Sequence, residues 1–478
     1  MSHFRLLLAL VPALTGIMLT VAPLLAQEQN SYGSGVGGMS AASSGASFQG
    51  SVPAERGTAG VFPLSLRRAI ELGLANNLGL LLSKEGVLSA RGQRWIEFSK
   101  LLPNLSTSAS AHHLKESLAI SGISLPGVPA VVGPYNFYDA RVFLTQRIFD
   151  LEAIKRSQAA AHELSAAELS ERDARELVVV TVGAAYLQAL ADATRVETVK
   201  AQVVTAGTIL DRAVEMHKVG VTPGIDELRA RVEWLTRSQQ FIVVENDLAK
   251  QKLGLLRMIG LPGGQEIELT DRAPFQPLAA GAVDEDISKA LASRDDYRAG
   301  QNLLQAAQAS HLAAQAQRLP ALVLDADYGA TGISLSSMNT TYHIVGSIKM
   351  PIFEGGKIHG DELRAKALVK EREEELGDLR TRIEFEVRSA LLDVGAAARE
   401  VDVASETVEL AELALSQAQE RFAAGINDNL EVVQAQQSVA AAHEGQVSSQ
   451  YQHNLAKLLL ARAMGVAGEG ATGFPGGR

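Results

Sequence analysis

Two long stretches without proline constrain the fold of this chain more than any other feature. They run from Asp150 to Val219 and from Glu354 to Ala424, and each covers some 70 residues. An α-helix rises about 1.5 Å per residue, so each stretch predicts a helix of about 105 Å. Since proline breaks helices and the 478 residues contain only 15, we expect a mainly α-helical chain.

The second stretch carries an apolar seam in which the spacing alternates between four and three residues. The seam consists of Ile383, Val387, Ala390, Val394, Ala397, Val401, Ala404, Val408, Ala411, Leu415, Ala418 and Phe422. The first stretch has a matching seam 205 residues earlier (383 − 178 = 205), from Val178 to His217, which only Asp192 and His217 interrupt. This spacing is typical of coiled coils, so both stretches are predicted to pack against other helices.

A similar turn follows each long stretch. The segments "MHKVGVTPGIDELRA" (216–230) and "RFAAGINDNLEVVQA" (421–435) both contain a glycine, a short polar segment and an acid before an apolar helix start. Glycine commonly ends a helix, and Pro, Asp and Asn commonly begin one. We therefore predict two long antiparallel helical hairpins. Their turns are marked by Gly220, Pro223, Asp226 and Gly425.

Each half of the chain also carries a predicted β-hairpin before its long helix. Pro103 and Pro320 are 217 residues apart (320 − 103 = 217) and end the helices predicted at 64–103 and 284–320. Alternation of apolar and polar residues then predicts four strands, at 104–113, 138–150, 321–329 and 342–354. The strands meet the long helices at junctions that are marked by Phe149, Phe353, Gly355 and Gly356.

The predicted strands have one apolar and one polar face, and Asp325 and Asp327 share the polar face. Roughly ten residues is the length that a tilted membrane strand needs, which favours membrane hairpins. The alternative is a soluble hairpin that packs on a helix. Four strands cannot close a barrel, for which about eight is the minimum, so a membrane location would require several copies.

The N-terminus predicts export. Arg5 precedes a mostly apolar run up to Ala26, after which a signal peptidase would cleave; the alternative is a signal anchor. No further apolar run of about 18 residues is expected. The chain has no cysteine, which excludes disulfides, thiolate metal sites and lipid attachment to an N-terminal cysteine. The net charge of −10 argues against nucleic-acid binding.

The patterns predict six segments. They are a signal peptide at 1–26, a flexible leader at 27–61, a first repeat at 62–265, a linker at 266–283, a second repeat at 284–466 and a disordered tail at 467–478. Each repeat contains a helix, a β-hairpin and a long helical hairpin, as expected of an internal duplication.

This plan resembles the TolC family of outer membrane efflux factors. The resemblance covers about Leu64 to Gly465 and is carried by "SLRRAIELGLANN" before "LLPNLS", by "MPIFEGGK" and by "AGINDNLEVVQAQ". It implies a homotrimer in outer-membrane lipid, in which each chain gives four strands to one twelve-stranded barrel and long helices to a periplasmic α-barrel. It also implies partners: a periplasmic adaptor and an inner-membrane pump of the RND or ABC type.

The resemblance further implies a gate at the periplasmic tip of the second helical hairpin. Relatives place an Arg after the turn glycine and two Asp one helical turn apart, where this chain has Asn427, Glu431 and Gln434. In a trimer, Asp428 and Glu431 would form a carboxylate ring that favours cations. The alternative is that both acids only cap the returning helix, as we expect for Asp226 and Glu227 in the first hairpin.

No other motif predicts a site. "EREEELGD" (371–378) is interpreted as a solvated helix face, and His112 with His113 as surface residues. No set of nucleophile, base and orienting group is found, so we expect no enzyme, cofactor or metal. The predicted function is a passive, tip-gated exit duct for efflux or protein secretion. An exported coiled-coil adhesin or scaffold is the competing class.

Overall fold

The computed structural model describes residues 47–53, 60–117, 122, 129–271, 283–424 and 429–470. The predicted signal peptide and the tip residues Gly425, Asn427 and Asp428 lie outside these ranges. Six elements make up the first half: α3 (Leu66–Asn76), α4 (Leu78–Ser99), β2 (Asn104–Ser117), β3 (Val131–Phe149), α5 (Leu151–Lys218) and α6 (Gly224–Ile259). The same order recurs in α7 (Val283–Ser293), α8 (Asp295–Ala316), β5 (Ala321–Gly332), β6 (Asn339–Lys349), α9 (Lys357–Ala423) and α10 (Asn429–Ala463).

The two long helices have the predicted extent. The side chain of Asp150 caps α5 by accepting a hydrogen bond from the Ala153 N–H at 3.1 Å. At the start of α9, Gly355 and Gly356 have φ of 60° and 89°, which are values that glycine adopts without strain. The two junctions therefore turn the chain by different means, a capping aspartate in one half and a glycine pair in the other.

The predicted heptad seams are buried. Nine of the twelve seam residues of α9 are buried and the other three are half-buried. In α5 the seam is buried from Val178 to Ala213 at most positions, including Asp192, whereas His217 is exposed. Burial of one stripe along each helix is the driving force for helix pairing that the sequence predicted.

Each half opens with two helices and not with the single predicted helix. The break lies at Asn77 in the first half and at Arg294 in the second, 217 residues apart (294 − 77 = 217), and both residues are extended. Asn77 accepts a hydrogen bond from the Gly79 N–H and so caps α4. Arg294 makes no such cap, and its buried guanidinium instead pairs with Asp296 and Glu386.

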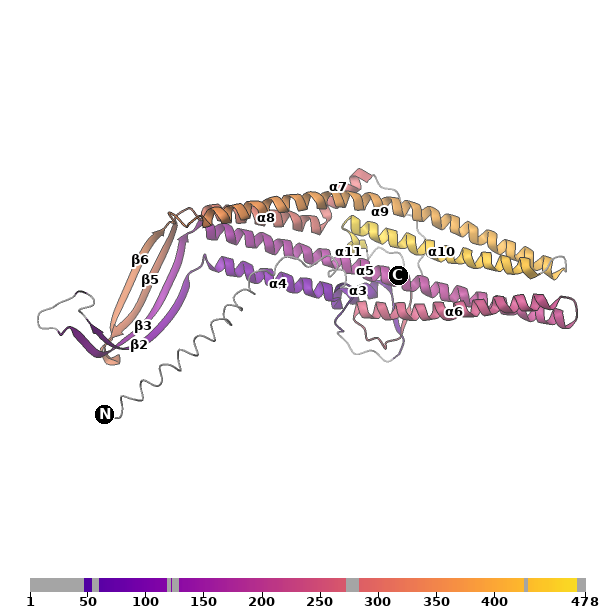
Figure 1. The fold of residues 1–478 in the computed structure, drawn as a ribbon, viewed down its shortest axis with the longest axis horizontal. Coiled ribbons are helices and arrows are strands. Elements are labelled where there is room, and N and C mark those ends of the chain that lie inside the picture. The colour runs from indigo at the N-terminus through magenta and orange to yellow at the C-terminus, as the bar shows by residue number, and fades with distance from the viewer. Residues whose placement is uncertain are drawn as a thin grey trace, which may run out of the picture. The chain divides into compact units, whose positions relative to one another are not determined.

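Helices α4, α5, α8 and α9 pack side by side in that order (Figure 1). Toward the hairpin turns, α6 packs on α5 and α10 packs on α9, and α10 also contacts α5. Within the described residues, only α5 is long and apolar enough to cross a membrane by length and composition, which corrects the expectation of no such run. Of its most apolar window, 56% is buried, as in a packed core helix.

The four long strands form one antiparallel sheet in the order β2-β3-β5-β6. The hairpins β2/β3 and β5/β6 meet through β3 and β5, where Thr145 is opposite Asp325 and Phe143 is opposite Asp327. The strands are 14, 19, 12 and 11 residues long, so they extend beyond most of the predicted ranges. Strands β2 and β6 are the two edges of this sheet.

Some segments that were predicted to be loose are ordered. In the predicted linker, β4 (Ile267–Leu269) pairs in parallel with β1 (Phe62–Leu64), because Ile267 and Leu64 can both enter the core there. In the predicted leader, Phe48 packs on the same core, and its carbonyl oxygen accepts a hydrogen bond from Asn77. In the predicted tail, α11 (Ala467–Gly470) buries the small side chain of Ala467 against α5.

Candidate functional site: two hairpin tips, a cavity between the hairpins and a polar sheet face

The first tip joins α5 to α6 through a turn at Gly220, whose φ is 72°. His217 in the last turn of α5 lies 2.8 Å from Glu227 in the first turn of α6. This hydrogen bond is the main cause that lowers the pKa of the Glu227 carboxyl. Glu227 also accepts a hydrogen bond from Arg231 at 3.1 Å, so it links the two helices of the hairpin.

The expected capping by Asp226 and Glu227 is not what the structure shows. The N-cap of α6 is Pro223, which has no side-chain hydrogen bond to the helix. Both acids lie in the first turn, where a negative charge stabilises the helix dipole. Asp226 is buried and lies 3.5 Å from Arg229.

The second tip joins α9 to α10 and contains an ion pair that sequence reasoning missed. Glu431 in the first turn of α10 accepts a hydrogen bond from Arg421 in the last turn of α9. The arginine of this tip thus precedes the turn, whereas the family pattern has one after it. Both tips pair a base and an acid ten residues apart (227 − 217 = 431 − 421 = 10), and this recurrence is the signal that could have revealed the pair.

Beneath the second tip lies a small apolar cluster. Phe422 and Val432 are buried at its centre with Ala418, and Ile209 and Met216 of α5 pack against them. This cluster therefore joins the second hairpin to the first. Gln434 is exposed on α10, and its carbonyl oxygen accepts a hydrogen bond from Ser438.

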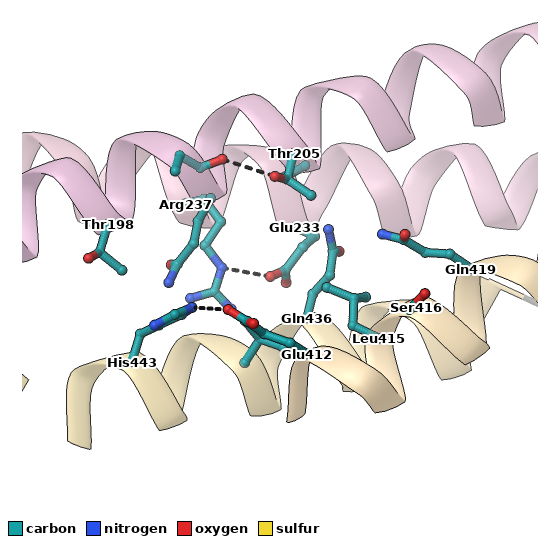
Figure 2. A pocket seen from close by; sticks show the side chains of 14 residues that line it. Thr198, Thr205, Glu233, Arg237, Glu412, Leu415, Ser416, Gln419, Gln436 and His443 are labelled. Carbon is teal, nitrogen blue, oxygen red and sulfur yellow. Dashed lines mark hydrogen bonds and ion pairs between the residues drawn. The ribbon is translucent and has the colours of Figure 1, made fainter. Parts of the chain in front are cut away.

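Farther from the tips, a cavity of about 420 Å³ lies between the two hairpins and is lined by α5, α6, α9 and α10. Figure 2 shows its charged side chains, Glu233 and Arg237 on one side and Glu412 and His443 on the other. Glu233 and Arg237 are buried and hydrogen-bonded at 2.8 Å. The Nε2 atom of His443 lies 3.1 Å from Glu412. The hairpins are thus joined by apolar contact at the tip and by polar contacts farther from it, among them the hydrogen bonds that Arg195 of α5 donates to Glu444 of α10 at 2.6 and 2.7 Å.

The polar face of the sheet gathers charged residues from β3 and β5. Arg141 donates hydrogen bonds to Asp139 at 2.8 Å and to Asp327 at 2.6 Å, and Thr145 donates one to Asp325 at 3.0 Å. The opposite face exposes large apolar side chains, including Tyr342, Ile344 and Ile348 on β6. A sheet that is apolar on one face and polar on the other suits a boundary between lipid and water.

The predicted junction residues lie at the ends of the elements. Pro103 and Pro320 are exposed and directly precede β2 and β5. Phe149 ends β3 and is 49% exposed, and Phe353 follows β6 and is 87% exposed. Such exposure of phenylalanine at strand ends calls for an apolar or interfacial environment.

A cluster of ion pairs clamps the far end of α10. Arg462 donates hydrogen bonds to Asp173 and Glu176 of α5 at 2.5 and 3.1 Å, while Arg294 pairs with Asp296 and Glu386. Burial raises the pKa of Asp173 and of Glu176, although Arg462 opposes this effect. The sequence analysis did not foresee this cluster because its members lie far apart in the chain. Within the described residues, no group of three or more His, Asp or Glu side chains could hold a metal ion.

The fold, with its paired helical hairpins and its apolar-faced sheet, is that of outer-membrane channels. Over 84% of the chain it superposes on 86% of the outer membrane channel CmeC of Campylobacter jejuni with a TM-score of 0.74, at 20% sequence identity. The toluene efflux pump outer membrane protein TtgF of Pseudomonas putida is 23% identical over 407 residues, which cover 84% of this chain and 83% of TtgF. The alkaline protease secretion protein AprF of Pseudomonas aeruginosa is 23% identical over 348 residues, 70% of this chain and 71% of AprF.

The profile of the outer membrane efflux protein family matches residues 69–261 and 287–466. The chain therefore belongs to the outer membrane efflux protein family, and its location is the outer membrane. The resemblance to TolC-like proteins that the sequence motifs suggested is confirmed.

Proposed function

We propose that three copies of this chain form a passive exit duct in the outer membrane, closed at its periplasmic helical tips. The observation that carries the proposal is the sheet β2-β3-β5-β6, which has two unpaired edges and one apolar face. Unpaired backbone groups are not tolerated in lipid. Pairing β6 of one copy with β2 of the next would remove every edge, and three copies would give twelve strands, above the minimum of about eight.

The helices support the same arrangement. Exposed apolar side chains form one stripe along α6: Ile225, Leu228, Val232, Leu235, Ile242 and Leu253. A second stripe runs along α9: Leu363, Phe385, Leu392, Val403, Leu410 and Leu413. Each stripe falls within an arc of roughly 100° of its helix, at about 100° per residue. Such stripes call for cover by another helix, and a neighbouring copy would supply it.

The domain plan is part of the proposal. Residues 62–265 and 284–466 would be two repeats of one ancestral unit, with 266–283 as the linker. The recurrence of six elements in the same order supports this interpretation. The chain would need no cofactor and would perform no catalysis, because a duct only provides a path.

The proposed gate lies at the tip of the second hairpin. The ion pair between Arg421 and Glu431 would hold the hairpin closed within each copy, and Asp428, Asn427 and Gln434 would add polar contacts around the axis. Opening would be an untwisting of the second hairpin, and a partner with higher affinity for the open state would drive it. The exposed Val219 and Val221 of the first tip would meet this partner, a periplasmic adaptor.

The relatives support two cargo classes. TtgF is described as part of a toluene efflux pump, and AprF as part of alkaline protease secretion. Similar identity to both leaves the choice to the adaptor and inner-membrane pump that would join this chain in a tripartite complex. The competing proposal, a scaffold or adhesin without a channel, would leave the apolar sheet face without a function.

Single-channel conductance in a planar bilayer tests the proposal. Purified wild-type protein should migrate as a trimer on a mild detergent gel and give small cation-selective openings. The variant with Glu431→Ala and Asp428→Ala should lose cation selectivity or open more widely. Absence of both trimer and conductance would overturn the duct in favour of the scaffold. Unchanged selectivity in the variant would keep the duct and reduce these acids to helix-end residues.

A further inference from the structure

Helices α4 and α9 are the outer members of the row α4-α5-α8-α9, so each has a side that no helix of the row covers (Figure 1). Between α4 and α5 lies an open groove of about 390 Å³ with three cations, Lys84, Arg91 and Arg172. Two carboxylates also line it. Glu168 lies 3.8 Å from Arg91, and Glu171 is bound to Arg175 at 2.9 Å.

Two of the groove's cations are uncompensated. Within the described part of the chain, Lys84 and Arg172 have neither a hydrogen bond nor an ion pair, and both are exposed. Lys84 and Arg91 lie on one stripe of α4 with the exposed Leu88, Trp95 and Phe98, within an arc of roughly 80°. The open side of α4 is thus apolar near the sheet and basic farther from it.

The open side of α9 has the complementary pattern. It carries the acidic run 371–378, in which Glu371 and Glu374 have no ion pair or hydrogen bond among the described residues. Glu371, Glu374 and Asp378 share a stripe with the exposed Leu363 and Phe385, within an arc of roughly 80°. The acids on this stripe are exposed and face away from the chain's own packing, as the interpretation of a solvated helix face requires.

The charges also lie at matching heights. Both helices meet the sheet at the same end of its strands: α4 ends at Ser99, before β2, and α9 begins at Lys357, after β6. At about 1.5 Å per residue, Arg91 and Lys84 lie roughly 12 and 22 Å from the sheet end of α4, and Glu371 and Glu374 lie roughly 21 and 25 Å from the sheet end of α9. Side by side with these ends level, Lys84 would lie at the height of Glu371 and Glu374, and Arg91 would lie nearer to the sheet.

We propose that the basic groove of α4/α5 binds the acidic run of α9 of a second copy, and that this contact sets the register between neighbouring copies. The inference rests on the proposed trimer and names the residues that would align it. Exposed ion pairs contribute little affinity, but complementary charges select partner and register. An adhesive apolar stripe alone would allow neighbouring helices to slide by a turn.

Charge reversal and charge exchange test this contact in the full-length protein in mild detergent. Lys84→Glu with Arg91→Glu, and separately Glu371→Lys with Glu374→Lys, should each lower the trimer-to-monomer ratio at least about tenfold at low salt. The loss should shrink at 1 M salt, where charges are screened. Combining all four substitutions should restore the ratio. The control, Glu373→Lys with Glu375→Lys, changes acids of the same run outside the stripe and should have little effect.

Crosslinking gives a second measurement that does not depend on stability. The chain has no cysteine, so Leu88→Cys with Glu374→Cys introduces the only two thiols. A short bis-maleimide reagent should then link neighbouring copies into covalent dimers and trimers, whereas Leu88→Cys with Glu373→Cys should be linked poorly.

The outcomes separate the two proposals. A wild-type trimer that is insensitive to both reversals, that is not restored by the fourfold exchange, or that gives no crosslink would overturn the charge contact and leave the duct standing. A wild-type protein that remains monomeric would overturn both proposals. Loss in each reversal with recovery in the exchange supports the contact.

Discussion

The two hairpin tips share a spacing but differ in their base. At the first tip His217 pairs with Glu227, and at the second Arg421 pairs with Glu431, each pair ten residues apart across the turn. An imidazole changes its charge between about pH 5 and 8, whereas a guanidinium is always charged. The base of the second tip is therefore a permanent cation, whereas the base of the first tip is an imidazole that is hydrogen-bonded to Glu227.

The tips also differ in what they bury. Val219 and Val221 at the first tip are 72% and 65% exposed, whereas Phe422 and Val432 at the second are 5% and 1% exposed. The seam position that holds Phe422 in α9 holds His217 in α5 (422 − 217 = 205). The first tip thus offers apolar side chains to a partner, and the second uses them to close on its own chain. Two elements of the same plan can therefore differ in what they contact through a single exchange of residue.

Removing the buried aromatic should have the largest effect. Phe422→Ala should destabilise the second hairpin by about 3 kcal/mol, because it leaves a cavity in the cluster with Val432. The matched substitution His217→Ala at the exposed equivalent should cost under about 1 kcal/mol. Chemical unfolding in detergent, followed by helical circular dichroism, measures both. Equal losses would show that the two tips are packed alike.

Releasing the second tip's ion pair should have the next largest effect. Arg421→Ala should weaken closure by about 0.5 kcal/mol per chain, hence about 1.5 kcal/mol in a trimer, which raises the open-to-closed ratio roughly tenfold. The charge-preserving Arg421→Lys should change it much less. Conductance traces in a planar bilayer record the ratio. An Arg421→Ala channel as closed as the wild type would remove this pair from the proposed gate.

The first tip should respond to acid through Glu227. Since His217 lowers the pKa of Glu227, the pair's stabilisation is present above the ordinary carboxyl pKa and is lost as pH falls through the lowered value. The His217→Gln variant should lose part of this stabilisation already at neutral pH. The amide hydrogen-exchange rates of residues 216–228, corrected for intrinsic rates, measure the stability of the first tip from pH 7.5 to 3.5. A flat profile for the wild type would contradict the assigned pKa shift.

Much of the fold could be predicted because its strongest signals are local and periodic. The seam of α9 from Ile383 to Phe422 and the strand alternation appear in any short window of sequence. The breaks at Asn77 and Arg294 escaped prediction because each depends on a tertiary partner, the Phe48 carbonyl in one case and Glu386 in the other. Strands β1 and β4 escaped for the same reason, since each has three residues and pairs far along the chain.

The candidate site was predicted less completely than the fold. Glu431 was identified from its position after the turn, but Arg421 was overlooked because contacts across a hairpin depend on the helix phase at both ends. The clamp of Arg462 on Asp173 joins residues 289 apart, a distance over which a single sequence carries no periodic signal. Charged residues become informative only once the packing fixes which faces are covered, as on α4 and α9.

The smallest predicted effect concerns the turn of the first tip. Gly220 has φ of 72° and open space where a Cβ would lie, so Gly220→Ala meets no clash and only the backbone strain of the left-handed region. That strain costs about 1 kcal/mol, and Gly220→Asn should cost less because asparagine tolerates this region. The amide hydrogen-exchange rates of residues 216–228 should therefore rise more in the alanine variant than in the asparagine variant. The exchange rates of α9 and α10 should stay unchanged. A change that spread to the second hairpin would show that the tips are coupled rather than independent.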